Sequence, residues 1–523
     1  MSKANLLSTA PAALLALAIG TGTATAQDGA PAPVGSFLSP TSGMFMLDYQ
    51  TIDLTTGGKF DLHGVNYLHQ LNDWLYTGIG FGAPMFHGDY GGFFSANLTV
   101  HAQAPLVGNW FVDGGLSFGA GAGGSSVQNI LELSGSGTYL KKYIGLGYDF
   151  GPVRAGVNFA DIEISNSPID DTMLMFFVQK PLDYALGKHA DHGTSVPTSE
   201  YSALGNETIV SFEYSTLTQL NATGSFSGNI GLVSPQISHF LSDDTYYFFG
   251  LDLGFSGLVW YNQAQGGIGH RIAVTPNLNL YGQLGIGSGG WVTDHIDTGP
   301  GLIVYPKVKA EYKFTDDLGV SVSAGYLAAP LGTSRNWSVG AGINYHMPSA
   351  AQAMAAEEDD VALRGLRVSL FQRAMFDIEY NGGPVDDLYL STAQIDYSFG
   401  DNWYIPLQIA AAVNDFRGYA GYVEGFVGLG YETDTFFNDR LQGYAQIMYG
   451  LNDLAITPAH DPGALVYPSV GFNYNLSDKF SLYAQAGKIG SIAQWTDPGS
   501  GKQFDGTTIG LGVSYRFGQP VWR

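Results

Sequence analysis

The stretch that most constrains the fold covers residues 299–347. Between Val304 and Phe314 the even positions are apolar or aromatic, whereas the odd positions carry Tyr, Lys and Glu. Successive side chains of a β-strand point to opposite sides, so alternation over about ten residues marks a strand whose faces meet different media. A helix would need a period of about 3.6 residues, which is absent here. The stretch therefore predicts strands with one apolar and one polar face.

The same pattern occurs three times along the chain. It returns in residues 461–517 and, more faintly, in residues 134–164. Counting strands and turns predicts eight strands in each of three repeats. The predicted boundaries are an N-terminal extension at 27–41, repeats at 42–182, 206–347 and 366–523, and linkers at 183–205 and 348–365.

Both linkers are longer than the other connections on the same side of the repeats, which are a few residues long. The second could form a short helix over residues 353–363. We expect both linkers to be the first sites of proteolysis in the intact protein. We also expect residues 363–523 to refold alone, if the first strand of each repeat pairs with its eighth.

Residues 1–26 have the features of a secretory signal peptide. Lys3 precedes an apolar run at 14–19, and Ala24-Thr25-Ala26 is an A-x-A cleavage site. No later segment approaches the roughly 18 to 20 apolar residues of a transmembrane helix. The chain has no Cys, so disulfides are excluded even for an exported protein.

Composition separates the remaining classes of protein. The chain has 72 Gly in 523 residues, 13% aromatic residues, only 13% charged residues and a net charge of −24. Together with period-two segments after a signal peptide, these values favour an outer-membrane β-barrel. The acidity argues against nucleic-acid binding, which rewards basic surfaces. A soluble secreted β-sandwich is the alternative, but it needs no aromatic strand ends.

Connection lengths predict an orientation. Short turns, such as 242–244 and 477–479, alternate with long Gly- and Asp-rich loops, such as 121–137 and 490–506. Outer-membrane barrels have short periplasmic turns and longer extracellular loops, so each repeat should begin and end in the periplasm. Aromatic residues just after the short turns would form the inner aromatic girdle.

The predicted inward faces are small and polar. Examples are Gln442, Tyr444, Gln446 and Met448 in the third repeat and Asp113, Ser117 and Gly119 in the first. An eight-stranded barrel is just wide enough for side chains to fill it, so small residues relieve crowding. Lys307, Lys309, Glu311 and Lys313 would face inward in the second repeat and would need internal partners or water.

With these features the chain resembles the small eight-stranded outer-membrane barrels of the OmpA/OmpX type, repeated in tandem. Gly512, Tyr515 and Phe517 resemble the C-terminal signal read by the barrel-assembly machinery, although six residues follow Phe517. The resemblance implies an all-β fold of transmembrane antiparallel barrels. We favour three tandem barrels, because the linkers are too long for neighbouring strands and the lumen faces too small. A single 24-stranded barrel remains the alternative.

Three segments were considered for chemistry. His189-Ala190-Asp191-His192 has metal-like spacing, but it lacks a further ligand nearby and is interpreted as a solvated loop. Asp294-His295-Ile296-Asp297 and His460-Asp461 lie on long loops, where outer-membrane hydrolases carry catalytic groups. No nucleophile is fixed by spacing, so no catalytic, cofactor-binding or metal-binding residue is assigned.

The sequence thus predicts a non-enzymatic integral outer-membrane protein of a Gram-negative bacterium that is structural or interacts through its extracellular loops. The alternatives are a porin or passive channel and, third, an outer-membrane hydrolase. The expected partners are outer-membrane lipid, lipopolysaccharide and the barrel-assembly machinery, but no nucleic acid. Divalent cations could bind the acidic loops through Asp89, Asp294, Asp297, Asp386, Asp387, Asp415 and Asp497.

Overall fold

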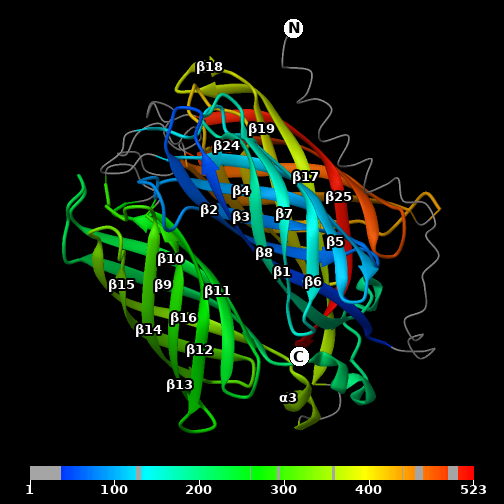
Figure 1. Cartoon of the computed structure of the whole chain (residues 1–523). Coiled ribbons are helices and arrows are strands. Elements are labelled where there is room, and N and C mark those ends of the chain that lie inside the picture. Colours follow the sequence, from blue (N-terminus) through cyan, green and yellow to red (C-terminus); the bar gives the residue numbers. More distant parts are fainter. Residues whose placement is uncertain are drawn as a thin grey trace.

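The computed structural model describes residues 37–124, 131–258, 261–290, 295–355, 360–438, 440–453, 463–492 and 504–523. These residues form three groups of antiparallel strands, coloured blue to cyan, green, and yellow to red in Figure 1. In the part of the chain so described, no helix is long and apolar enough to cross a membrane. The predicted signal peptide, residues 1–26, lies outside the described residues.

The first group is a closed barrel of eight strands, barrel 1. The first strand pairs with the eighth, in a register that places Met44 opposite Pro181. The strands are β1 (Ser39–Asp53), β2 (Lys59–Gln70), β3 (Leu75–Ala83), β4 (Phe94–Val107), β5 (Trp110–Ala122), β6 (Thr138–Asp149), β7 (Arg154–Ile164) and β8 (Asp170–Leu186).

The second group, barrel 2, closes in the same way. Its first strand pairs with its last, which places Ala341 opposite Tyr214. The strands are β9 (Thr208–Gln219), β10 (Asn229–Phe240), β11 (Thr245–Ser256), β12 (Asn262–Ala273), β13 (Leu278–Gly289), β14 (Leu302–Lys313), β15 (Leu318–Ala328) and β16 (Arg335–Met347).

The third group, barrel 3, closes through its two longest strands and carries one short additional strand, β18. Pairing between β17 and β25 completes the barrel. The strands are β17 (Val361–Tyr380), β18 (Gly383–Val385), β19 (Leu388–Ser398), β20 (Trp403–Ala412), β21 (Val423–Glu432), β22 (Leu441–Asp453), β23 (Gly463–Asn475), β24 (Phe480–Ser491) and β25 (Phe504–Trp522).

Closure within each group confirms three tandem eight-stranded antiparallel barrels and rules out a single 24-stranded barrel. The described strands β8 and β16 pair with β1 and β9 and not with the strands that follow them in the chain. A single large barrel would require pairing across the linkers. The inward Gly and Ser residues fit this result, because eight strands leave room for side chains and little else.

The period-two pattern is confirmed in β14. Tyr305, Lys307, Lys309 and Glu311 are buried in the lumen, whereas Val308 and Tyr312 are more than half exposed on the outer surface. Lys313, at the end of the strand, is half-buried and donates to the carbonyl of Asp316 at 3.5 Å. The outer surface of all three barrels is correspondingly apolar.

Each barrel has a turn end, with the short hairpin turns, and a loop end, with the longer loops. Barrel 1 contacts both neighbours at the loop end. The amide of Gly91 donates to the carbonyl of Gly299 in barrel 2 at 3.1 Å. The Thr138 hydroxyl donates to the carbonyl of Val413 in barrel 3. Both linkers and the C-terminus lie together at the turn end, at the lower side of Figure 1.

The segments predicted to be linkers contain strand and helix residues. Residues 183–186 continue strand β8, and residues 361–365 already belong to β17. The short helix suggested for residues 353–363 is instead α3 (Ala350–Ala355). Val361 and Leu363 cannot extend that helix, because they pair with Trp522 and Pro520 of β25. Two 3-10 helices occupy the first linker: η1 (His189–Asp191) and η2 (Thr198–Leu204).

Candidate functional site

Charged side chains fill the turn-end half of barrel 2. Nε2 of His346 lies 2.9 Å from the Glu311 carboxylate, and its Nδ1 lies 2.6 Å from Glu207. The Tyr281 hydroxyl donates to Glu311 at 2.5 Å, and Arg271 donates to Glu207 at 2.6 Å. Buried charges are tolerated only when they are paired and hydrogen-bonded. These contacts therefore supply the internal partners that the sequence requires.

The two inward lysines of β14 have separate partners. Nζ of Lys307 lies 2.7 Å from the Glu213 carboxylate. Lys309 donates to the Asn344 side chain at 3.2 Å, and its ammonium lies 4.7 Å from the ring centre of Tyr281. The void beside these lysines measures about 10 Å³, which is room for about one water molecule. The lumen of barrel 2 is therefore filled at this level.

Barrel 1 is filled by a mainly polar network. The carboxylate of Asp113 accepts hydrogen bonds from Asn158 at 2.7 Å and from Gln179 at 2.9 Å. Asp48 forms a buried ion pair with Lys141 at 3.1 Å. Asp113, Asn158 and Gln179 have no exposed surface. The inward positions predicted for β5 are thus confirmed, and they serve packing and hydrogen bonding within the barrel.

Barrel 3 contains two buried arginines with carboxylate partners. Nε of Arg367 donates to Asp396 and its Nη1 donates to Glu432, both at 2.7 Å. Arg373 pairs with Glu424 one layer closer to the loop end. Sequence reasoning did not identify these pairs, because the partners come from strands far apart in the chain. The only available signal was the presence of Arg at inward positions of β17.

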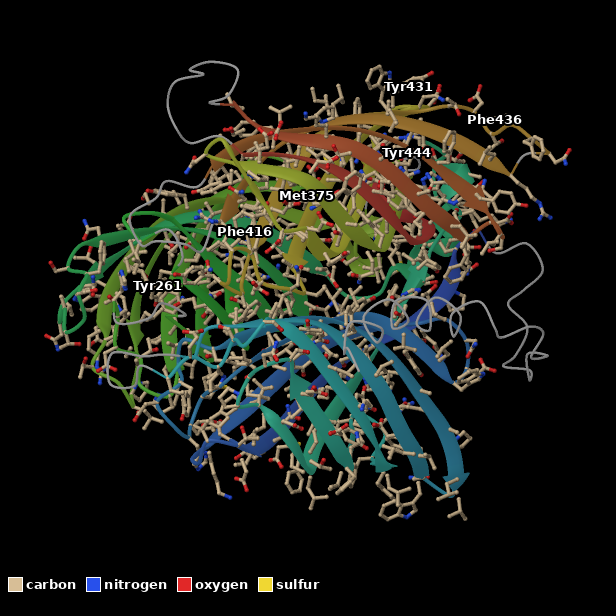
Figure 2. All side chains as sticks on the ribbon, turned by 90° about the horizontal axis from the view of Figure 1, so that it is seen from above. Tyr261, Met375, Phe416, Tyr431, Phe436 and Tyr444 are labelled. Atoms are coloured by element: carbon tan, nitrogen blue, oxygen red, sulfur yellow. The ribbon has the colours of Figure 1, made fainter. Side chains whose placement is uncertain are left out.

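Above these polar layers, each barrel is closed at its loop end by a cluster of buried apolar side chains. In Figure 2, Met375 and Phe416 lie close together within barrel 3, whereas Phe436 lies at its outer edge. Loop residues such as Phe93, Ile296 and Phe416 complete the clusters by folding over the barrel openings. The lumens are therefore blocked in two ways, by paired polar side chains and by apolar contacts.

The loop residues considered for catalysis have structural roles where they are described. The Asp297 carboxylate accepts hydrogen bonds from the Gly299 amide at 3.0 Å and from the Thr333 hydroxyl at 2.8 Å. Asp297 is buried, and its neighbour Ile296 belongs to the apolar cluster of barrel 2. The following candidates lie outside the described residues: Asp294, His460 and Asp461.

The acidic loop residues do not converge. Asp89 is exposed on a loop of barrel 1, whereas Asp386 and Asp387 are exposed on one loop of barrel 3. Asp415 accepts a hydrogen bond from the Gly418 amide at 2.9 Å. Asp497 lies outside the described residues. Among the residues that the structure describes, no group of three or more His, Cys, Asp or Glu is placed to hold a metal ion.

The first linker binds to the closing strands of barrel 3 through a backbone ladder. Gly187 and Gly518 exchange two hydrogen bonds of 2.8 Å. On the other closing strand, the Gly193 amide donates to the Leu363 carbonyl at 2.8 Å, and the Leu363 amide donates to Thr194 at 3.0 Å. The linker therefore spans the seam where β17 meets β25.

An apolar cluster, the turn-end cluster, secures this arrangement. It joins the N-terminal segment, both linkers and the rim of barrel 3. Helix α3 contributes Ala353, which packs beside η2. The buried members are Leu38, Ala185, Val196, Tyr201, Ala353, Val361 and Leu363. The described parts of both linkers thus pack against the rim of barrel 3, which makes them less accessible to a protease than the sequence predicts.

The two histidines with metal-like spacing lie in this linker and face barrel 3. The Nδ1 atom of His192 accepts a hydrogen bond from the Gly365 amide at 3.1 Å. Burial lowers the pKa of His189 to about 4; Glu432 opposes this effect, while Arg367 and Arg516 add to it. The His189 imidazole is therefore neutral at neutral pH and covers the mouth of barrel 3 near Arg367.

We expect the linker to loosen as the pH falls from about 6.5 towards 4. The pKa of His189 is about 4 in the folded protein against 6.5 for an unperturbed group, so the unfolded segment binds more protons in this window. Linkage then makes docking less stable at lower pH, by about 3 kcal/mol in total at about 1.4 kcal/mol per pKa unit. Proteolysis of residues 187–196 should accelerate at pH 5, and His189→Gln should reduce that acceleration.

The residues that resemble a C-terminal assembly signal lie on β25, where barrel 3 meets barrel 1. Gly512 is an inward glycine of β25 and has no room for a side chain beside Phe371. The ring centres of Tyr515 and His69 of barrel 1 are 4.5 Å apart, and Tyr515 also packs at tilted angles against Phe480 and Phe517. The aromatic positions therefore also serve contacts between barrels.

No protein-family model and no curated protein sequence matches the chain. Solved structures with low similarity include a de novo designed transmembrane β-barrel, 15% identical, covering 27% of this chain and 96% of that chain, with a TM-score of 0.20. The siderophore receptor PirA from Pseudomonas aeruginosa is 10% identical, with 91% and 80% coverage and a TM-score of 0.27. The KdgM porin is 10% identical, with 59% and 98% coverage and a TM-score of 0.15. These similarities are too weak to assign a family or a function.

Proposed function

We propose that the chain is an integral outer-membrane protein of a Gram-negative bacterium, built from three non-conducting barrels and acting as a scaffold through its extracellular loops. The observation that carries this proposal is the filling of all three lumens beneath an apolar outer surface. Buried polar, charged and aromatic side chains fill the lumens between the strands, and apolar clusters close the loop ends. Outward-facing apolar strands that satisfy their backbone groups by closure are suited to a bilayer.

In this proposal the turn end faces the periplasm and the loop end faces outward. Short turns belong on the periplasmic side of such barrels. Aromatic residues such as Trp110 and Trp403 are partly exposed just after these turns. Amphipathic rings at this level suit the membrane–water interface. Outer-membrane lipid and lipopolysaccharide would then be the surrounding partners, and Gly512, Tyr515 and Phe517 would be available to the barrel-assembly machinery before barrel 3 docks.

We further propose that the protein is not an enzyme. Its described loop carboxylate Asp297 accepts hydrogen bonds from the Gly299 amide and the Thr333 hydroxyl and is therefore committed to holding the loop. Turnover of outer-membrane lipid or peptide by the purified protein, lost on His295→Ala with His460→Ala, would contradict this. Divalent cations remain proposed only for the exposed acids Asp89, Asp386 and Asp387. Thermal stability that is unchanged by a chelator would refute the cation proposal.

We expect the full chain to show no stable unitary conductance in planar bilayers. The porin alternative requires a continuous aqueous path, whereas residues such as Tyr261 and Ile303 are wholly buried across the lumen of barrel 2. Flotation with liposomes should verify membrane insertion in the same preparation, so that a lack of conductance is not confused with a lack of inserted protein. Long-lived conductance steps in inserted protein would support the porin and contradict the filled scaffold.

A further inference from the structure

The outer surface of barrel 2 is hollowed into a shallow apolar groove of about 650 Å³ across strands β11 to β16. This volume lies within the range of roughly 300–1,000 Å³ for small-molecule sites. The walls are formed by outward side chains that are almost entirely apolar, with Leu284, Pro306 and Val308 at the middle. We name it the barrel 2 groove.

Two small outward residues create the hollow. Gly282 and Ala324 lie on either side of Val308 in adjacent strands, as its direct cross-strand neighbours. A Cβ atom placed on Gly282 would meet no atom within 4 Å, so the space above this glycine is open. Larger side chains surround these two positions. The space left open by the small residues is therefore the groove itself.

The two ends of the groove differ from its middle. At the turn end, the Thr245 hydroxyl lies 3.4 Å from Nδ1 of His270. At the loop end, Tyr326 and Trp337 pack edge to face with ring centres 5.0 Å apart. Polar groups and amphipathic aromatic rings suit the two interfaces of a bilayer, whereas the uncharged middle suits its hydrocarbon.

The described neighbours in this chain contact barrel 2 elsewhere. Phe45 of barrel 1 approaches Tyr247 on β11, with ring centres 6.3 Å apart. The loop contact uses Gly299, and the contact with barrel 3 lies between β16 and β25 at the turn end. The groove therefore belongs to the outward face that the proposed function places against lipid.

We propose that the barrel 2 groove binds one acyl chain of a phospholipid of the periplasmic leaflet, with its head group beside Thr245 and His270. The inference rests on the proposed membrane location. The charged lining residue Lys307 points inward and pairs with Glu213, so the outward side chains of the groove match a hydrocarbon chain and offer no charged group to a protein segment. The polar pair at the turn end is placed to hydrogen-bond a head-group oxygen.

The test uses the full chain in nanodiscs of phosphatidylcholine that carry a small fraction of the same lipid with a photoreactive diazirine in one acyl chain. After irradiation, peptide mapping should show crosslinks at Ile268, Leu284 and Val308 at least fivefold above Ile144 and Leu146, which are outward positions on barrel 1. The filling variant Gly282→Leu with Ala324→Leu should lower the enrichment to that background.

A matched control variant places larger side chains on the apolar outer surface at two positions outside the groove. Ala341 and Ala445 are exposed outward residues, so Ala341→Leu with Ala445→Leu should leave the enrichment unchanged. Equal labelling of groove and background positions in the wild type, or unchanged enrichment in the filling variant, would overturn the proposal. Failure to enter nanodiscs at all would refute the membrane location itself.

Discussion

Replacing Glu311 by Ala is expected to destabilise the protein by about 3–5 kcal/mol, the range for removing one partner of a buried ion pair. Glu311 has no exposed surface and accepts hydrogen bonds from Tyr281 and His346. Its removal would leave His346 with one carboxylate partner, Glu207, and would remove a negative charge from the strand that carries Lys309. The free energy of unfolding in urea, followed after refolding in detergent, measures the effect.

A matched exposed pair provides the control. Lys142 and Asp161 are cross-strand neighbours on barrel 1, 2.9 Å apart, with about half of each side chain exposed. Exposed pairs contribute about 0–1 kcal/mol, so Asp161→Ala should change stability by less than 1 kcal/mol. Equal effects of Glu311→Ala and Asp161→Ala would mean that the lumen of barrel 2 is hydrated, contrary to the filled lumen.

The strand pattern was predictable because a membrane barrel places successive side chains of every strand alternately in the lumen and on the outer surface. In β14, the period-two pattern identified which residues face inward, and the structure confirms this for Lys307, Lys309 and Glu311. Eight strands per barrel also followed from the spacing of turns. The short strand β18 was not predicted, because a three-residue strand beyond a barrel rim has no alternation to detect.

The contents of the lumens could not be predicted in the same way. Lys307 pairs with Glu213, which is nearly one hundred residues away and belongs to β9. Alternation in the sequence predicts which side chains of a strand face the lumen. It does not predict which inward side chains of two distant strands lie at the same level of the barrel. The apolar clusters had a local signal, since Phe60 and Leu62 are apolar at inward positions of β2. This break in the polar inward face marks where the lumen closes.

The docking of the linkers onto barrel 3 was not predicted, for a physical reason. Residues 187–196 are rich in Gly and polar side chains, which is typical of an exposed loop. Their attachment depends on backbone hydrogen bonds to β17 and β25, and such bonds leave little trace in side-chain patterns. Only Val196 and Tyr201, apolar residues within a polar stretch, indicated that the segment packs against something.

We therefore expect the first linker to resist proteolysis in the intact protein, and Leu363→Asp to abolish that resistance. Leu363 has no exposed surface and packs against Gly187 within the turn-end cluster. An unpaired carboxylate at this position would destabilise the docked linker by several kcal/mol. Each 1.4 kcal/mol raises the population of undocked linker about tenfold. When opening is fast, cleavage follows that population, so cutting within residues 187–196 should accelerate by a factor of about 100 or more.

Thr194→Asp is the matched control, because it adds the same charge at an exposed side chain of the linker that pairs with Leu363. Its cleavage rate should equal that of the wild type at pH 7. The ladder between Thr194 and Leu363 uses main-chain atoms and survives this substitution. A wild-type linker that is cut as fast as a free peptide of the same sequence would contradict docking. In that case barrel 3 would close without the linker, and residues 363–523 should refold alone with the stability they have in the full chain.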